Sequence, residues 1–249
     1  MKSILEKTGE YCERLKGLAL HFVCEERIEE KTYTFKRSFL LRRGVELAED
    51  LREDKTAKKS YIYDYQMVKK GDDFKERRNL LAENGKKKNE QDVELKTTRM
   101  SSQFLVFGPV GFLSQYWQKH FNYEITGSEN SGPRRAVVLR AEPKEPREEN
   151  NNLGKIWVDE ADYSILKIEW EPPSIVSLAE TVKSSVGELK RKITWAVSYD
   201  IIHKGVRFPS RQLIREVYIT KNDKEHLKYE AAYAFGNYKY FVVETEVIW

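Results

Sequence analysis

Apolar and polar positions follow two different periods in the first part of the chain. Between residues 4 and 15 the apolar positions recur every three or four residues, which predicts a helix. Ser3 and Glu6 have the spacing of a capping box at its start, and Gly17 is a suitable residue to end it. After Gly17 the period changes to two, the period of a β-strand with one buried face.

The alternating runs that follow predict two hairpins. Residues 18–27 and 33–41 alternate on either side of a short polar connection at residues 29–31. A third run, Tyr61 to Met67, is followed by a second apolar stretch over residues 74–82. Asn84-Gly85 is a turn signal after that stretch.

The segment from about Met100 to Phe121 has a different pattern. Residues 104–107 are continuously apolar, and Gly108-Pro109 interrupts them. From Val110 to Phe121 apolar residues recur at helical spacing, so we expect a helix with Pro109 in its first turn.

Beyond Tyr123 the sequence predicts strands almost throughout, separated by turn signals such as Gly127-Ser128, Gly205 and Gly236-Asn237. No strand–helix–strand alternation is present, which argues against a parallel sheet. We therefore expect a mainly β fold with a few helices (α+β): a strongly curved antiparallel sheet, an open half-barrel, covered by an N-terminal helix and an internal apolar helix. One domain is expected to span residues 1–249. The predicted strands are residues 123–126, 136–140, 154–159, 165–170, 193–203, 211–220, 228–235 and 240–248.

Composition and charge narrow the possible partners. Charged residues make up 34% of the 249 residues and hydrophobic ones 40%, and no window approaches the ~20 apolar residues of a membrane span, so an integral helical membrane protein is excluded. The 44 basic and 40 acidic residues are interleaved. Even Lys69 to Arg99, the densest charged stretch, mixes both signs, so we expect a solvated surface and no nucleic-acid partner.

Residues for catalysis or metal binding are not arranged in known motifs. The sequence contains no nucleophile elbow, phosphate-binding loop or dinucleotide-binding glycine motif. The histidines share no short motif, so we expect no metal, no cofactor and no enzymatic activity. The four histidines are His21, His120, His203 and His226.

Two features of the sequence suggest a buried site. Cys12 and Cys24 lie on either side of a chain reversal, so from spacing alone they are either a disulfide or two buried free thiols. Aromatic residues make up 12% of the chain and are dense in the predicted internal helix, which either packs as core or borders a cavity for an apolar ligand. The candidate cavity lining is Phe104, Phe107, Phe112, Leu113, Tyr116, Trp117, Phe121, Trp157, Ile168, Trp170 and Trp195.

One segment carries a family resemblance. Residues 154–169, GKIWVDEADYSILKIE, form a strand that ends in an acidic turn and continues into an apolar–basic–apolar strand. This pattern resembles the LolA/LolB-like superfamily of periplasmic outer-membrane lipoprotein-sorting proteins. The resemblance covers roughly residues 150–249, and the charged stretch at Lys69–Arg99 departs from it.

The resemblance implies an open half-barrel with a cavity for acyl chains, and a periplasmic location with the signal peptide absent from this sequence. It also favours a disulfide between Cys12 and Cys24. The expected function is therefore non-enzymatic binding of a lipid or an acylated lipoprotein. The alternative is a module of the same fold that binds another envelope protein and carries no lipid.

Overall fold

A computed structural model describes residues 1–42, 45–70, 73–97, 105–145, 152–171, 181–184, 187–220 and 222–241. Its helical elements are α1 (Lys2–Leu18), the 3₁₀ turn η1 (Leu105–Phe107), α2 (Gly108–Leu113) and α3 (Gln115–Gln118). Its strands are β1 (Phe22–Arg42), β2 (Val45–Lys70), β3 (Asp73–Glu83), β4 (Lys86–Glu90), β5 (Phe121–Ser131), β6 (Arg134–Pro143), β7 (Gly154–Asp159), β8 (Ile165–Trp170), β9 (Thr181–Ser184), β10 (Gly187–Ser198), β11 (Ile201–His203), β12 (Val206–Phe208), β13 (Arg211–Ile219) and β14 (Glu225–Tyr240).

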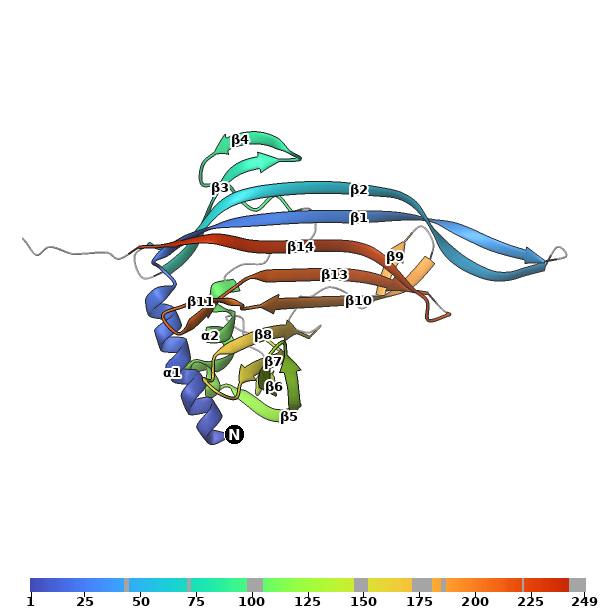
Figure 1. Cartoon of the computed structure of the whole chain (residues 1–249). Coiled ribbons are helices and arrows are strands. Elements are labelled where there is room, and N and C mark those ends of the chain that lie inside the picture. Colours follow the sequence, from blue (N-terminus) through green and yellow to red (C-terminus); the bar gives the residue numbers. More distant parts are fainter. Residues whose placement is uncertain are drawn as a thin grey trace, which may run out of the picture.

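Within the described residues, the main sheet is antiparallel and open. Its strand order is β4-β3-β2-β1-β14-β13-β10-β8-β7-β6-β5, with β9 paired to β10, while β11 and β12 form a separate hairpin. The strands β4 and β5 are the two edges of this order and do not pair with each other, so the sheet is not closed into a barrel (Figure 1). The expected mainly β fold, with a curved open sheet and few helices, is confirmed.

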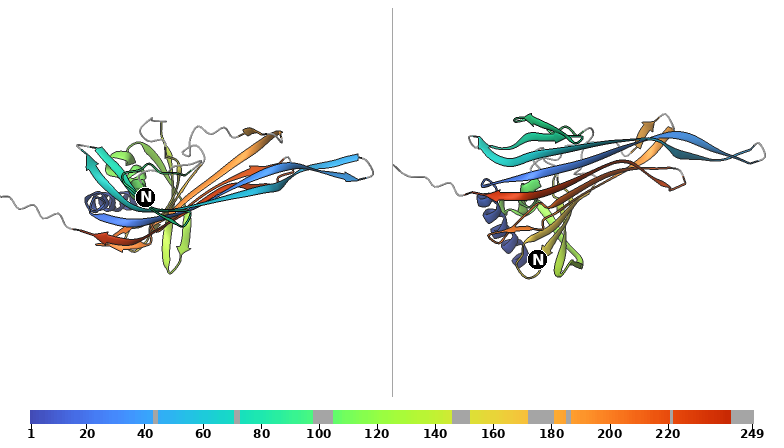
Figure 2. Two further views of the ribbon diagram at one scale, coloured as in Figure 1. Left: turned by 90° about the horizontal axis from the view of Figure 1, so that it is seen from above. Right: turned by 45° about the horizontal axis from the view of Figure 1, so that its top comes forward.

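The helices lie over one end of the sheet only. Helix α1 packs on α2 and on β12, α2 packs on β8, and α3 packs on β5. The long strands β1 and β2 run far beyond this end (Figures 1 and 2). We call the sheet face that carries the helices the inner face, and the opposite face the outer face.

The predicted first helix is confirmed, but its cap is not. Helix α1 buries Tyr11, Cys12 and Leu15 on the face that the spacing indicated. It begins at Lys2 with Met1 as N-cap and no side-chain cap hydrogen bond, so Ser3 lies inside the first turn rather than at the cap. The helix passes Gly17 and ends at Leu18.

The predicted hairpin between residues 18 and 41 is wrong. Strand β1 is one continuous strand that pairs with β2 on one side and with β14 on the other. The supposed connection at residues 29–31 lies within it. The error arose because Glu26 and Glu30 are buried on the inner face, beside the apolar Cys24 and Ile28, so the dry face of the strand is half polar.

The predicted pairing of β2 with β3 is confirmed. Tyr61, Tyr63, Tyr65 and Met67 are all buried, as their alternation indicated. Strand β3 pairs with them through residues 73–83.

The predicted apolar helix is broken into shorter pieces. Pro109 stands in the first turn of α2, as predicted, but α2 ends at Leu113 because Ser114 is extended, with ψ 152°. Gly108 allows a close approach here: a Cβ at this position would lie 2.6 Å from the Tyr199 hydroxyl. That hydroxyl donates a hydrogen bond of 2.9 Å to the Leu105 carbonyl oxygen, which ties the segment to the sheet.

The predicted strands of the C-terminal half are largely confirmed. The bounds of β7 and β8 are those the sequence predicts. The predicted strand 193–203 divides, because β10 ends at Ser198 and the β11–β12 hairpin begins at Ile201.

Two predicted turns in this half are wrong. Gly127-Ser128 lies inside β5, and Gly236-Asn237 lies inside β14. Asn237 has φ 53° at a register shift between β14 and β1, so this pair forms a bulge rather than a turn. The predicted strand 240–248 lies outside the described residues after Phe241.

The motif of residues 154–169 has a structural explanation. A Cβ on Gly154 would lie 2.2 Å from the Glu169 carbonyl oxygen, so only glycine fits where β7 begins beside β8. In the acidic turn, Asp159 accepts the Ala161 amide at 2.9 Å and Asp162 accepts the Ser164 amide at 2.9 Å. These residues therefore build a turn.

The predicted disulfide is not formed. Cys12 and Cys24 are free and buried. The Cys12 thiol lies 3.5 Å from the Pro109 carbonyl oxygen on α2, whereas Cys24 hydrogen-bonds with Tyr238 of β14. Burial raises the pKa of both thiols. The chain reversal after α1 places the two side chains against different elements instead of against each other.

Candidate functional site

Five of the predicted lining residues are closed core. Their side chains are at most 7% exposed and lie in one apolar cluster between the inner face of the sheet and α2. The Phe112 ring lies 5.9 Å from the ring of Phe121 and 6.1 Å from that of Trp170. These residues pack closely against one another beneath α2. The five are Phe112, Leu113, Phe121, Ile168 and Trp170.

Three others lie at the border of that cluster. Phe107, Trp117 and Trp195 are partly buried and pack against it. Trp195 stacks on Trp170 at 4.5 Å with an interplanar angle of 20°, as expected for directly paired residues of β10 and β8. These three side chains therefore leave part of their aromatic surface exposed at the border of the cluster. The predicted Phe104 lies outside the described residues.

Two predicted lining residues are placed elsewhere. Tyr116 is 59% exposed on α3, because the break at Ser114 turns this helix away from the core. Trp157 lies on the outer face, in a separate small cluster with Ala136, Val138 and Leu166. The alternation of β7 puts Ile156 and Val158 inward, so the sequence-based choice of face was wrong for Trp157 by one residue.

The other half of the inner face holds buried charges. Arg78 on β3 donates to Glu26 on β1 at 2.6 and 3.3 Å and to Glu76 at 2.9 Å. The Tyr65 hydroxyl donates to Glu76 at 2.8 Å, and the Tyr65 ring lies 4.8 Å from the guanidinium. Burial raises the pKa of Glu26, although Arg78 opposes this change. We call Glu26, Tyr65, Glu76 and Arg78 the charge cluster.

Further buried polar pairs continue this region across the sheet. The Tyr229 hydroxyl donates to Glu30 at 2.8 Å between β14 and β1, and Arg191 lies 2.8 Å from Glu216 between β10 and β13. Sequence reasoning missed these residues, because the partners are far apart along the chain. The only available signal was the alternation of Glu26, Ile28 and Glu30, which has the period of a strand.

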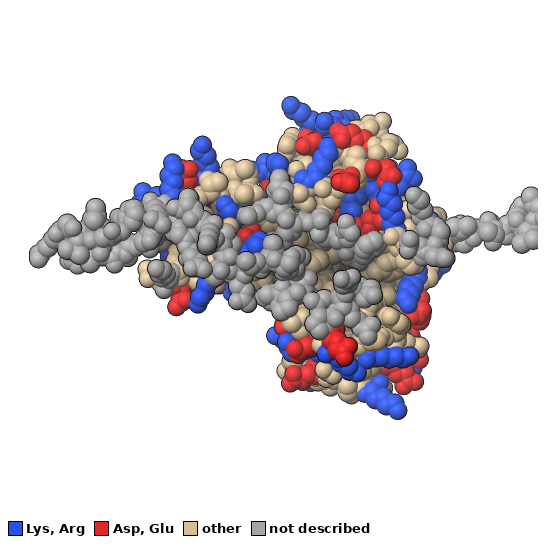
Figure 3. Space-filling view, turned by 180° about the vertical axis from the view of Figure 1, so that it is seen from behind, with Lys and Arg blue, Asp and Glu red and all other residues tan. Residues whose placement is uncertain are grey.

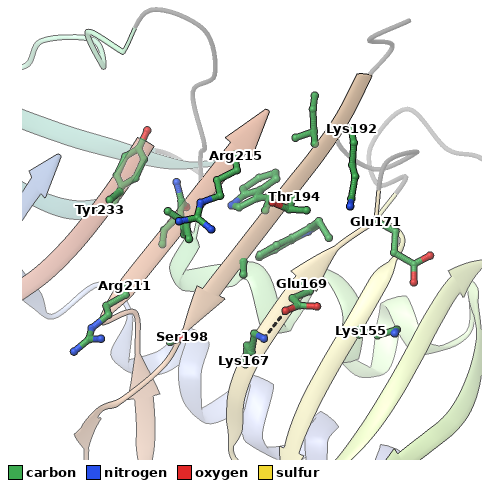
Figure 4. A pocket seen from close by; sticks show the side chains of 17 residues that line it. Lys155, Lys167, Glu169, Glu171, Lys192, Thr194, Ser198, Arg211, Arg215 and Tyr233 are labelled. Atoms are coloured by element: carbon green, nitrogen blue, oxygen red, sulfur yellow. Dashed lines mark ion pairs between the residues drawn. The ribbon is translucent and has the colours of Figure 1, made fainter. Parts of the chain in front are cut away.

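A groove of about 720 Å³ lies on the outer face, across β7, β8, β10, β13 and β14 (Figure 4). Ile168 and Trp170 face α2, since both lie 3.4 Å from the position of a Cβ on Gly108. The alternating residues Lys167 and Glu169 therefore face away from the helices, into the groove. Its volume is in the range of ligand sites in proteins.

The strand register gives the shape of this groove. Its floor is the row of directly paired residues Ala196, Leu213 and Ala232 on β10, β13 and β14. The two walls lie on either side of this floor, each two residues away from it along the strands. One wall is the paired row Lys167, Ser198 and Arg211, and the other is the pair Thr194 and Arg215. The groove is deepest where the small Ala196 and Ala232 of its floor lie between the long side chains of Lys167, Arg211 and Arg215.

Basic residues outnumber acidic ones around the groove. Its lining includes five cations, Lys155, Lys167, Lys192, Arg211 and Arg215, but only two carboxylates, Glu169 and Glu171. Lys167 is paired with Glu169, Lys192 with Glu225 at 2.8 Å, and Arg215 with Glu230 at 2.8 Å. Lys155 and Arg211 form no ion pair within the described residues.

The described residues contain no group of three or more histidine, cysteine, aspartate or glutamate side chains placed to hold a metal ion. Among the described helices, none is long and apolar enough to cross a membrane. On the face seen in Figure 3, basic and acidic side chains are interspersed rather than gathered into one patch.

Comparison with solved structures finds matches over nearly the whole chain, at low identity. A LolA superfamily protein from Nitrosomonas europaea matches with 14% identity and a TM-score of 0.41, over 98% of this chain and 94% of that one. An outer membrane lipoprotein-sorting protein domain from Vibrio parahaemolyticus matches with 12% identity and a TM-score of 0.41, over 97% and 95%. At such values the matches carry no information on ligands or site residues.

No family model matches the sequence. No curated protein matches it either.

Proposed function

We propose that this protein is a non-enzymatic binding protein that holds the acyl chains of a lipid or lipoprotein against the inner face of its sheet. The sequence motif of residues 154–169 supports a bacterial periplasmic location as part of this proposal. The ligand would lie beside the Trp170–Trp195 pair, where the partly buried Trp195 borders the closed core.

The observation that carries the proposal is the position of the helices. They pack on β5, β8 and β12 and on one another, at one end of the inner face. The apolar inner face continues past them along β10 and β13, where Ile193 and Ile214 join the same cluster as Trp170. An acyl chain placed on this surface leaves water, and each methylene buried contributes about 0.8 kcal/mol.

Native mass spectrometry of the protein purified from a bacterial envelope tests the proposal. We expect an adduct with the mass of a lipid or acylated peptide, which organic extraction removes. A fluorescent fatty-acid probe should then bind the extracted protein. Trp195→Ala should weaken this binding, while Tyr116→Ala, an exposed aromatic outside the surface, should not.

An empty protein that also fails to bind the probe would contradict the proposal. That outcome would instead favour the alternative function of a module that binds another envelope protein without lipid.

A further inference from the structure

We propose that the outer-face groove binds an extended acidic peptide segment of a partner protein. The groove and the proposed acyl surface share Trp170 and Trp195, which line both. They open on opposite faces of the sheet, because the floor residues Ala196 and Leu213 point away from the helices, whereas Trp195, between Ala196 and Thr194 on β10, points toward them.

The dimensions of the groove fit a single extended chain. The Ser198–Arg211 wall and the Thr194–Arg215 wall are four residues apart along β10 and β13, or about 13 Å at a strand rise of about 3.3 Å. Their side chains narrow that width further. An extended peptide is narrower than this width, so it can lie between the walls and reach the floor.

The charges of the groove define the chemistry of this peptide. Lys155 and Arg211, which form no ion pair within the described residues, lie toward opposite ends of the groove (Figure 4). Lys192 is paired with Glu225, and Arg215 with Glu230. Acidic side chains of a bound peptide could take the place of these two carboxylates. Alternate side chains of an extended chain point to opposite sides, so a peptide with acidic residues can meet both walls.

The recessed floor distinguishes a peptide from other anionic partners. A flat membrane surface or a nucleic-acid duplex would contact the rim but not Ala196, Leu213 and Ala232. The rim charges are also of both signs, since Glu169 and Glu171 lie among the cations. A continuous anionic surface would be repelled by these two carboxylates, whereas a peptide can avoid them.

Fluorescence anisotropy with the full chain tests this inference. The probe is a fluorescein-labelled ten-residue peptide of alternating glutamate and alanine, measured at low salt. We expect binding at least about tenfold tighter than that of the same peptide with glutamine, which removes the charge and keeps the shape. Arg211→Glu and Lys155→Glu should each weaken binding by about fivefold or more.

Lys58→Glu is the matched control. Lys58 is an exposed lysine on β2, outside the groove, and its replacement changes the net charge by the same amount. We expect an affinity within about twofold of the unmodified protein. Circular dichroism checks that each variant is folded.

Three outcomes would overturn the inference. The first is equal binding of the glutamate and glutamine peptides, and the second is an equal loss of affinity in the Arg211 and Lys58 variants. The third is the absence of peptide binding together with binding of phosphatidylglycerol vesicles or duplex DNA that depends on Arg211. Because the peptide probe contains no acyl chain, the first two outcomes do not bear on the proposed acyl site. In the third outcome, the dependence on Arg211 assigns the binding to the groove and not to the acyl site.

Discussion

The two halves of the inner face are held together by different interactions. Beneath α2, Phe112 and Leu113 pack with Trp170 in an apolar cluster. Around β1, β2 and β3, the charge cluster buries Glu26 and Arg78 beside Glu76. Both halves are dry, but the second buries carboxylates, whose charge changes at acidic pH. Because buried residues on this sheet are either apolar or charged, burial alone does not identify a surface that could bind an apolar ligand.

The largest expected effect is in the charge cluster. Arg78→Ala leaves Glu26 and Glu76 buried without their cation, which should lower the free energy of unfolding by about 3–5 kcal/mol near pH 8. Chemical denaturation monitored by circular dichroism measures this loss.

The loss should depend on pH with a defined sign. Burial already raises the pKa of Glu26 in the folded protein, and removing Arg78 raises it further. A carboxyl whose folded pKa is raised stabilises the protein below its unfolded pKa, and this contribution is lost as pH rises through the folded pKa. The Arg78→Ala deficit should therefore be smaller at pH 5 than at pH 8, and a deficit that grows toward acid would contradict this account.

The matching change in the apolar half is Leu113→Ala. It removes a fully buried side chain and should cost about 3 kcal/mol, through lost burial and the cavity that remains. No titratable partner is involved, so the cost should be the same at pH 5 and pH 8. A pH-dependent cost would show that the two halves are not independent.

A smaller effect should follow from Tyr229→Phe. The change removes the hydroxyl that donates to Glu30 at 2.8 Å and keeps the ring in place. Hydrogen bonds to charged groups contribute about 1.5–3 kcal/mol, so we expect a loss near the lower end of that range. Tyr123→Phe provides a comparison in the apolar half, where the hydroxyl donates to the uncharged Phe112 carbonyl oxygen. An equal loss in the two variants would argue against a special role for the buried carboxylate.

The comparison also explains what the sequence could predict. Strands β7 and β8 were predicted with their bounds, because apolar alternation and the turn residues around Asp159 are local signals. Strand β1 was divided wrongly, because Glu26 is neutralised by Arg78, 52 positions away, and Glu30 is bonded by Tyr229, 199 positions away. Local patterns carry no information about such partners.

The candidate sites show the same limit. Phe112, Ile168 and Trp170, predicted to line a cavity, lie together in the buried core, because apolar spacing marks a buried face but does not distinguish core from cavity lining. The outer groove could not be predicted, since its floor and walls depend on the register of β10, β13 and β14. Trp157 was assigned to the wrong face because one residue of register decides the direction of a strand side chain.

Quenching of tryptophan fluorescence by a brominated fatty acid tests the proposed acyl surface most directly. Bromine on the acyl chain quenches only indoles in its vicinity, and the proposal places the chain beside Trp170 and Trp195 on the inner face. We predict that the quenching falls in Trp195→Phe and is unchanged in Trp157→Phe, whose indole lies on the outer face. Quenching that is lost with Trp157 and kept without Trp195, or no quenching at all, would contradict the proposed acyl site.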